Sequence, residues 1–517
     1  MSHPWDRPLG VWTVAERHPG LPAILDCPAG EQLTFAALAG RAHRIVHAMR
    51  ARGVGHGDVV GLVLPNDLDM VLWLLAAAEA GWRYVTLNPM STAEEVAAIA
   101  AHAEMKALVV DVEYGERAGR VTSVPVRVST SGGVPGYTPQ EEVLRGHPTT
   151  PPADRLAGVP LIYTSGTTGR PKGIWRAMPD VDPTAMADAT KTFAHAFRFQ
   201  PLEGAHLVSA GMHHGGCQAF YLAALHAGQA LVIMRRFDAE ETLRLIEKHR
   251  VTSGYMVPTQ FTRLVRLPAE VRSRYDVSSL QTIVHSAAPC PPEIKKQMLD
   301  WWGPVIWETY GGTEGAATIA KPHHWLARPG TVGRPIRGMT VRILDDDGAE
   351  LPAGQVGAVY LDSGEARFSY LRDPEQTAQV YRGSAFTLGD LGYLDADGFL
   401  FIVDRIKDMI ITGGTNVYPA EVEAVLAGHP AVADSAVVGA PDPEWGEQVR
   451  AVVQPAPGHE ASDALAAELI AHCRSRLASF KCPRAVEFRA ELPRTETGKL
   501  YKRLIRDELW ASAPPRA

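Results

Sequence analysis

The sequence holds 517 residues, of which 46% are hydrophobic and 21% are charged. That length exceeds what one hydrophobic core usually supports, so we expect a globular chain of two or more domains. The formal net charge of −7, without any block of basic residues, argues against nucleic acid as a partner.

The cysteines and the first residues indicate the compartment. The five cysteines are few and show no paired metal-ligand spacing, which argues against a disulfide framework. The N-terminus lacks the basic and then apolar pattern of a secretory signal, and no apolar run reaches membrane-spanning length. We therefore expect a cytoplasmic protein without a transmembrane segment.

Helical and strand patterns alternate along the first part of the chain, which is typical of parallel sheets covered by helices. The predicted elements cover residues 35–52, 59–64, 68–80, 82–87 and 108–112. Thr92 opens a further helix with two glutamates in its first turn. Residues 119–156 are rich in Ser, Gly, Pro and Thr, and we expect an irregular connection there.

The pattern changes after a second α/β run over residues 207–307. Short strands follow around an Asp-Gly turn at 347–348. A charged link begins near Asp404, and the residues after it have strands, helices and apolar content of their own. We therefore predict an N-terminal domain over 1–404 and a small α+β domain over 405–517.

The stretch Tyr-Thr-Ser-Gly-Thr-Thr-Gly-Arg-Pro-Lys-Gly at 163–173 indicates a phosphate clamp. Glycines let backbone N–H groups crowd around an anion, hydroxyls donate to it, and a lysine adds charge. Proline before Lys172 separates this loop from the common nucleotide loop, which has glycine there. A plain surface turn is the alternative. The candidate residues are Thr164, Ser165, Gly166, Thr167, Thr168, Gly169 and Lys172.

A second motif, Trp-Glu-Thr-Tyr-Gly-Gly-Thr-Glu-Gly, occupies residues 307–315. Tyr310 offers a flat face for a purine, and Gly311 and Gly312 allow a ligand to approach the backbone closely. Thr313 can donate to a phosphate. Glu314 can hold Mg²⁺, which prefers oxygen ligands and substrate phosphates. An ordinary glycine turn is the alternative here.

Two further groups complete the candidate site. Asp390, after Thr-Leu-Gly, is suited to grip a ribose diol, and Arg405 follows fifteen residues later. Lys499 ends the stretch Pro-Arg-Thr-Glu-Thr-Gly-Lys, where a compact positive charge can meet negative charge that develops during a reaction. Taken singly, each of these residues could be a turn cap or a surface side chain.

Together these four motifs, in this order, make the chain similar to the acyl-adenylate-forming superfamily of acyl-CoA synthetases, aryl-CoA ligases, luciferases and adenylation domains. The resemblance covers residues 33–509 and is strongest to bacterial stand-alone acyl-CoA ligases through residues 285–292 and 301–304. It implies an N-terminal domain of two α/β subdomains plus a small β-barrel. A small mobile α+β domain would follow, with the hinge near Lys407.

The resemblance also implies residue roles. Thr164 to Lys172 would hold the β- and γ-phosphates, Thr313 the α-phosphate, Glu314 the Mg²⁺, and Asp390 and Arg405 the ribose. The expected adenine and further nucleotide contacts are Ser286, Ala287, Ala288, Pro289, Tyr310, Gly311, Gly312 and Ile402. The expected catalytic residues are Lys499, Glu314, Thr313, Thr168 and His213. For His213, in Met-His-His-Gly-Gly, lining of the acyl pocket, plain packing and metal binding remain open.

The implied reaction joins a carboxylic acid to ATP, giving acyl-AMP and pyrophosphate, and then transfers the acyl group to CoA. The expected acceptor-binding residues are Gly413, Gly414, Trp445 and Phe480. Met90 and Cys482 stand where some relatives carry arginines for the CoA phosphate, which keeps open an amino-acid amine as acceptor. A non-catalytic nucleotide-binding protein is the third alternative, and the presence of both Lys499 and Glu314 argues against it.

Overall fold

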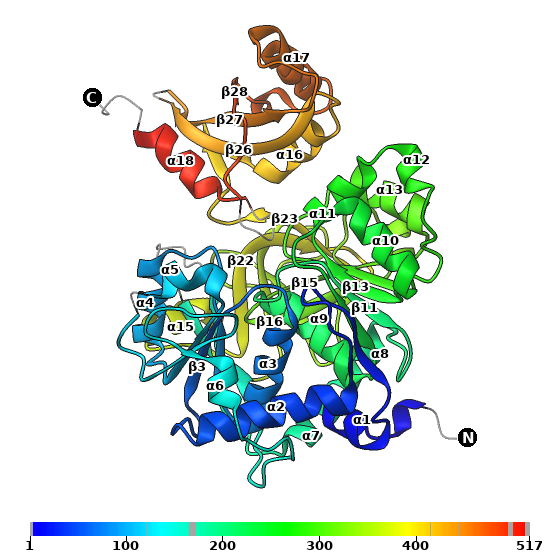
Figure 1. The fold of residues 1–517 in the computed structure, drawn as a ribbon. Coiled ribbons are helices and arrows are strands. Elements are labelled where there is room, and N and C mark those ends of the chain that lie inside the picture. The colour runs from blue at the N-terminus through cyan, green and yellow to red at the C-terminus, as the bar shows by residue number, and fades with distance from the viewer. Residues whose placement is uncertain are drawn as a thin grey trace. The chain divides into compact units, whose positions relative to one another are not determined.

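The computed structural model describes residues 4–119, 121–164, 172–413, 415–442, 444–494 and 500–511. The protein has a mixed α/β fold with a large N-terminal and a small C-terminal domain, as the sequence predicts (Figure 1). Contacts group the chain into two compact units. Unit 1 holds Met1–Met256, Arg266–Val284 and Arg367–Gln379, and unit 2 holds Val257–Val265, His285–Ala366 and Val380–Ala517.

The first sheet of unit 1 is parallel throughout and has the strand order β7-β6-β5-β3-β4-β8. Every residue of β3 and β5 is buried, as expected for parallel strands that are covered on both faces. The strands are β3 (Val59–Val63), β4 (Arg83–Thr86), β5 (Ala107–Val110), β6 (Val126–Ser129), β7 (Thr138–Pro139) and β8 (Val159–Pro160).

The helices of this region begin where the sequence predicts, and the first of them ends two residues before its predicted bound at 52. Thr92 and Glu95 form a capping box at the start of α4, and Gly81, at φ 71°, ends α3 in the left-handed region. The Asp67 carboxylate accepts from the N–H of Leu68 at the start of α3. The helices are α2 (Phe35–Arg50), α3 (Leu68–Ala80) and α4 (Ala93–His102).

The expectation of an irregular connection over residues 119–156 is wrong in part. This stretch contributes β6 and β7 to the edge of the parallel sheet, and α6 (Gln140–Leu144) follows them. Val128 and Val143 are fully buried. These elements are only two to five residues long, so the turn residues around them dominate the local composition.

Unit 1 also contributes five strands of a nine-stranded sheet, in the order β13-β11-β12-β1-β2. Its strands β1, β12, β11 and β13 run parallel, so their carboxyl ends lie at one edge, where α/β proteins commonly bind ligands. The loop after β11 leads into α9 (Gly215–His226). The strands are β1 (Pro22–Asp26), β2 (Leu33–Thr34), β11 (Ala205–Val208), β12 (Ala230–Ile233) and β13 (Ser253–Met256).

Unit 2 contains an antiparallel hairpin and a small antiparallel sheet. Strands β15 (Ile306–Gly312) and β16 (Gly315–Ala320) form the hairpin. The small sheet has the order β18-β19-β22-β21, and β23 pairs with β22. Its strands are β18 (Thr340–Leu344), β19 (Gly357–Asp362), β21 (Tyr381–Arg382), β22 (Ala385–Leu394) and β23 (Leu400–Arg405).

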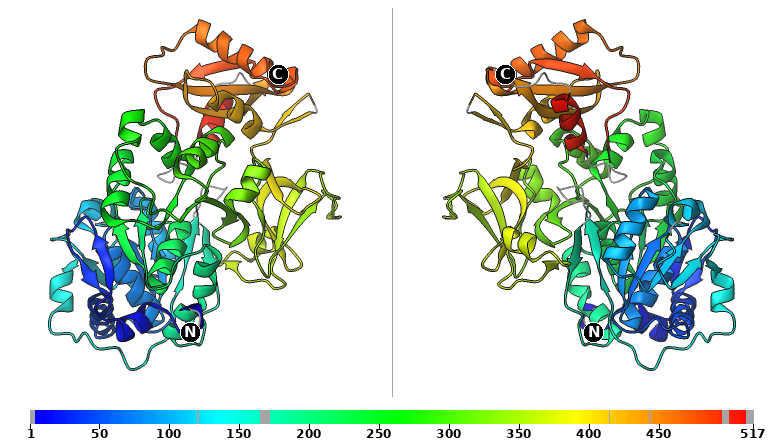
Figure 2. Two further views of the ribbon diagram at one scale, coloured as in Figure 1. Left: turned by 90° about the vertical axis from the view of Figure 1, so that its right-hand side faces the viewer. Right: turned by 90° about the vertical axis from the view of Figure 1, so that its left-hand side faces the viewer.

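The C-terminal part of unit 2 has its own sheet and cores, drawn orange to red in Figure 2. Alternate residues of β26 (Val432–Asp442) face different cores: Val437 packs with α16 (Pro419–Ala427) and α17 (Asp463–Arg474), whereas Val438 packs with α18 (Lys502–Ala511). Helices therefore cover both faces of this sheet. Its strands are β24 (Ile410–Thr412), β25 (Thr415–Val417), β26, β27 (Gly446–Pro455) and β28 (Ala485–Phe488).

Among the described residues, none of the helices combines the length and the apolar composition that crossing a membrane requires.

Candidate functional site

Three predicted nucleotide-binding residues meet in unit 2. The Tyr310 hydroxyl donates to Asp390 Oδ2 at 2.6 Å, and Arg405 Nε lies 2.6 Å from Asp390 Oδ1. The register of β22 against β23 places Asp390 directly opposite Arg405. Burial, and then the Asp390 charge, raise the pKa of Tyr310, so its hydroxyl remains a donor.

The first glycine of the second motif is required by the packing of the hairpin itself. A Cβ on Gly311 would lie 2.6 Å from the Cα of Ala316, a backbone atom that cannot move aside cheaply. A Cβ on Gly312 would lie 2.8 Å from Leu388 Cδ2, the end of a flexible side chain. We expected both glycines to admit a ligand, and the structure shows that the chain's own backbone already requires the one at Gly311.

The turn between β15 and β16 carries Thr313 and Glu314. The Thr313 hydroxyl donates to Glu314 Oε2 at 3.1 Å. This contact turns the hydroxyl and the carboxylate toward each other at the tip of the hairpin. The turn therefore places a carboxylate, which can coordinate Mg²⁺, beside a hydroxyl, which can donate to a phosphate.

The predicted adenine loop follows β14 (Thr282–His285). Ala287 has φ 75°, in the left-handed region that a residue with a side chain rarely adopts. Such conformations cost on the order of 1–3 kcal/mol and cluster at ligand sites. Ala287 and Pro289 are exposed and Ser286 and Ala288 are half-buried, so the loop is accessible to a ligand. Ile402 is half-buried on β23.

The phosphate clamp is framed by two antiparallel strands. Strands β9 (Ile162–Thr164) and β10 (Lys172–Trp175) pair with Lys172 opposite Thr164, which brings the two ends of the loop together. Residues 165–171, with the predicted Ser165, Gly166, Thr167, Thr168 and Gly169, lie outside the described residues. Lys172 leads into a strand and not a helix, as its sequence context predicts.

Aromatic side chains that were not predicted as site residues contact this frame. The Tyr163 hydroxyl lies 2.7 Å from His102 Nδ1. A Cβ on Gly173 would lie 3.0 Å from the Tyr163 ring, so the glycine lets the ring pack on the strand. Lys172 Nζ lies 5.4 Å from the centroid of the Tyr370 ring, within the range of a cation–π contact.

His213 lies in the loop between β11 and α9 and is 6% exposed. Burial lowers its pKa well below the usual value, and burial lowers the pKa of the neighbouring His214 to about 4, so both rings are neutral near pH 7. Their ring centroids are 3.9 Å apart. Within the described ranges, no group of three or more His, Cys, Asp or Glu side chains could hold a metal ion.

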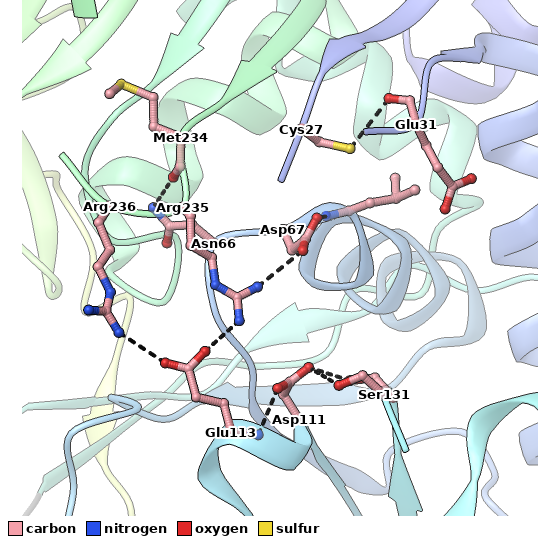
Figure 3. A network of polar contacts seen from close by, with 12 residues as sticks. Cys27, Glu31, Asn66, Asp67, Asp111, Glu113, Ser131, Met234, Arg235 and Arg236 are labelled. Atoms are coloured by element: carbon pink, nitrogen blue, oxygen red, sulfur yellow. Dashed lines mark hydrogen bonds and ion pairs between the residues drawn. The ribbon is translucent and has the colours of Figure 1, made fainter. Parts of the chain in front are cut away.

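Two side chains from the first sheet of unit 1 hold the His213 loop. Asn66 Oδ1 accepts from the N–H of Met212 at 2.8 Å, and Asn66 Nδ2 donates to Ala210 O at 2.9 Å. The Thr86 hydroxyl donates to His213 O at 2.7 Å. Asn66 also donates to the carbonyl of Met234 at 3.2 Å, a contact drawn in Figure 3. The loop is thus held at Ala210, at Met212 and at His213 itself.

Next to Asn66, charged residues join the ends of three strands (Figure 3). Arg235, after β12, contacts Asp67, after β3, at 3.1 Å and Glu113, after β5, at 2.5 Å. Arg236 contacts the other oxygen of Glu113 at 3.1 Å. This network links the parallel strands of the two sheets of unit 1. It lies next to the contacts that hold the His213 loop.

The candidate acceptor-binding aromatics are exposed, Trp445 by 41% and Phe480 by 47%. The N–H of Gly413 donates to Trp445 O at 2.9 Å, and a Cβ on Gly413 would lie 2.3 Å from the indole ring. Only glycine therefore fits beside Trp445. Arg484 Cζ lies 5.0 Å from the centroid of the same ring. Gly414 and the predicted catalytic Lys499 lie outside the described residues.

The fold is that of an enzyme class that binds AMP. Residues 11–366 match the AMP-binding enzyme family, and residues 421–499 match the AMP-binding enzyme C-terminal domain. The chain therefore belongs to the AMP-binding enzyme family, which confirms the resemblance deduced from the four motifs.

Relatives of two kinds cover nearly the whole chain. The medium/long-chain-fatty-acid–CoA ligase FadD8 of Mycobacterium tuberculosis is 33% identical over 96% of this chain and 89% of its own. Feruloyl-CoA synthase of Amycolatopsis sp is also 33% identical, over 96% of this chain and 98% of its own. The solved structure of the amide bond synthetase McbA from Marinactinospora thermotolerans is 31% identical, with a TM-score of 0.81 over 95% of this chain and 97% of its own.

Proposed function

We propose that the protein is an ATP-dependent carboxylic acid ligase that forms an acyl-AMP, releases pyrophosphate and transfers the acyl group to CoA. The observation that carries the nucleotide half is the convergence of Tyr310, Asp390 and Arg405 from three strands on one point. Family membership and two CoA ligases among the relatives support the same reaction.

In the first half-reaction, an oxygen of the acid attacks the α-phosphorus of ATP while the bond to the β-phosphate oxygen breaks. Two anions must approach each other, so the site must supply positive charge and N–H donors. We assign this work to Lys172 and the loop beside it, and to Lys499. Thr313 would donate to the α-phosphate.

The oxygen donors at the tip of the β15–β16 hairpin fit Mg²⁺. Glu314 would hold the ion together with substrate phosphates. When bound, Mg²⁺ would neutralise phosphate charge. Asp390 and Arg405 would bind the ribose, and Tyr310 with Ala287 to Pro289 would enclose the adenine.

In the second half-reaction, the thiol of CoA attacks the acyl carbon and AMP leaves. The proposed domains, 1–404 and 405–517, would rotate about Lys407 between the two steps. Trp445 and Phe480 are exposed, as residues that stack on a nucleotide must be.

An amine acceptor is the second candidate, and one specific observation favours it. The two cations beside the exposed aromatics already have acidic partners: Lys481 contacts both Glu421 oxygens, at 2.8 and 2.7 Å, and Arg484 lies 3.6 Å from Asp442. Cys482 is 4% exposed and cannot replace a phosphate-binding arginine. The amide bond synthetase among the structural relatives agrees with this alternative.

A panel of carboxylic acids tests the proposal directly. Each acid is incubated with ATP and Mg²⁺, and pyrophosphate release is measured alone, with CoA and with amino acids. We expect an acid-dependent release and a thioester product. Release without a thioester at millimolar CoA, together with an amide product, would establish the second candidate. No acid-dependent release with any member of a broad panel would contradict the ligase assignment.

A further inference from the structure

A buried ion pair lies behind the proposed adenine site and has no place in the mechanism above. Lys295, on α13 (Pro292–Trp302), is 0% exposed, and its ammonium group contacts Oε2 of Glu308 on β15. Glu308 is 8% exposed. His285, at the end of β14, is also fully buried, and its Nε2 lies 3.5 Å from the same carboxylate oxygen.

Each member of this cluster adjoins a proposed nucleotide-binding segment. His285 immediately precedes the loop 286–289, and α13 begins three residues after that loop. Glu308 lies two residues before Tyr310 on the same strand, and residues two apart on a strand project to the same side. The Lys295–Glu308 contact therefore joins, from inside the protein, the two segments that would enclose the adenine.

Stability alone is a poor explanation for this pair. Removing two charges from water costs about as much as their attraction returns, and apolar replacement of a buried pair is often neutral or stabilising. Burial raises the pKa of Glu308 while the Lys295 charge lowers it, and burial holds the pKa of His285 far below its usual value. Only Lys295 is thus left to balance the carboxylate within this cluster.

Such a pair instead fixes the relative position of the two elements that carry it. The reason is that a buried charge is strongly penalised in every arrangement that separates it from its partner. A purely apolar contact would let α13 and β15 slide with little cost. The Tyr310 hydroxyl is held separately by Asp390. The side chain of Tyr310 is thus held by Asp390, and the strand that carries Tyr310 is held by the Lys295–Glu308 pair.

We propose that Lys295 and Glu308 are positioning residues for adenylation, which hold the loop 286–289 and Tyr310 at the separation that ATP binding requires. The inference rests on the proposed function, since it assigns those two segments to the adenine. Neither residue would touch the nucleotide.

The test uses a charge-free double variant, Lys295→Met with Glu308→Gln, which leaves no unpaired buried charge. We measure the melting temperature, the dissociation constant of ATP by calorimetry without acid, and KM and kcat for pyrophosphate release. We expect a melting temperature close to that of the unchanged protein, ATP binding weaker by about tenfold and a KM for ATP raised by a similar factor. The KM for the acid should stay the same.

The matched control is the neighbouring surface pair. Lys296 and Asp300, on the same helix, form an exposed ion pair at 2.5 Å. The variant Lys296→Met with Asp300→Asn also removes one positive and one negative charge, and we expect no change in any of the readouts because exposed pairs contribute little.

Unchanged ATP affinity in a folded double variant would overturn the inference and leave the pair a purely structural one. If that variant does not fold, Glu308→Asp decides, since it keeps the charge but withdraws the carboxylate by one methylene. We then expect a folded protein with a raised KM for ATP, and an unchanged KM overturns the inference. Absence of pyrophosphate release from the unchanged protein would instead contradict the proposed function, while calorimetry with ATP would still test the positioning role.

Discussion

Asp404 caps a helix that begins fifteen residues after it: its Oδ2 accepts from the N–H of Ala420 at 2.8 Å, in the first turn of α16. Tyr418, the residue that precedes this helix, supplies no side-chain cap. The end of β23, where we place the start of the hinge, is therefore tied to α16 by a carboxylate at the helix N-terminus, which the helix dipole favours.

This cap predicts how stability depends on charge at Asp404. Asp404→Ala should lower the free energy of unfolding by about 1 kcal/mol, the usual value of a lost cap, because Ala420 loses its acceptor. Asp404→Asn should not, since an amide oxygen can accept the same bond. Denaturant unfolding of the two variants checks both statements, and equal losses would mean that the cap contributes nothing.

The pH dependence follows from the same residue. Burial is the largest influence on Asp404 and raises its pKa, with the Lys502 charge acting in the opposite direction. A group whose pKa is raised in the folded state contributes stability at low pH and loses it as pH rises through the folded pKa. The stability of the unchanged protein relative to Asp404→Asn should therefore fall as pH rises above the ordinary pKa of an aspartate. A difference that grows with pH would contradict this sign.

Tyr310→Phe should weaken ATP binding while sparing the fold. The change removes the 2.6 Å hydrogen bond to Asp390 but keeps the ring. Without this bond the Asp390 carboxylate is less firmly held for the ribose, so we expect the KM for ATP to rise, while the lost bond, worth about 1.5–3 kcal/mol of stability, should leave the protein folded. Pyrophosphate release at varied ATP measures it. Tyr360→Phe is the control. The Tyr360 hydroxyl accepts from Arg382, and neither residue belongs to the proposed nucleotide site.

Asn66→Ala should affect both stability and use of the acid. Its side chain joins Met212, Ala210 and Met234, so alanine leaves buried backbone groups without partners. Each such group costs about 1–3 kcal/mol, and a loss of that order is expected in denaturant unfolding. The KM for the acid should rise more than the KM for ATP if the loop of His213 lines the acyl pocket. Equal changes in both KM values would contradict that placement.

The sequence predicts this protein best where a local signal decides the structure. Thr92 with Glu95 marks a helix start, Gly81 marks a helix end, and both lie where predicted. The short strand β6 was missed because Val128 is its one buried apolar residue and turn residues surround it in the sequence.

At the site, too, the sequence predicted the local motifs and did not predict the tertiary contacts. Motif order identified the family and the residues Tyr310, Asp390 and Arg405, but no spacing rule could show that their side chains form one hydrogen-bonded group. Lys295 lies in an ordinary amphipathic helix pattern. Its buried partner Glu308 belongs to the second motif, but the motif assigned no role to it. Such pairs depend on tertiary contact, which the sequence pattern does not report.

Lys499→Ala should abolish acyl-AMP formation and leave ATP binding nearly intact. A cation that meets charge developing in the transition state contributes little to the ground state. Its loss should cost about 3 kcal/mol, a hundredfold or more in rate. Pyrophosphate release measures the loss, and the variant should still convert supplied acyl-AMP to product. Release close to that of the unchanged protein would remove Lys499 from the mechanism.

The acceptor can be identified through the exposed aromatics. If CoA is the acceptor, Trp445→Ala and Phe480→Ala should each raise the KM for CoA while leaving pyrophosphate release unchanged. Stacking on an aromatic ring is worth about 0.5–1.5 kcal/mol beyond area burial, which corresponds to a several-fold change for each variant. An amine has no nucleotide to stack, so neither change should alter amide formation.

CoA without its 3′-phosphate separates stacking from charge. Because Lys481 is paired with Glu421 and Arg484 lies near Asp442, neither cation is fully available to that phosphate. We expect the KM values for CoA and dephospho-CoA to differ by less than about tenfold, since an exposed charge pair contributes roughly 0–1 kcal/mol. A much larger preference for CoA would show that Arg484 or Lys481 leaves its acidic partner to bind the phosphate. In that case Glu421→Gln should lower the KM for CoA further, by releasing Lys481.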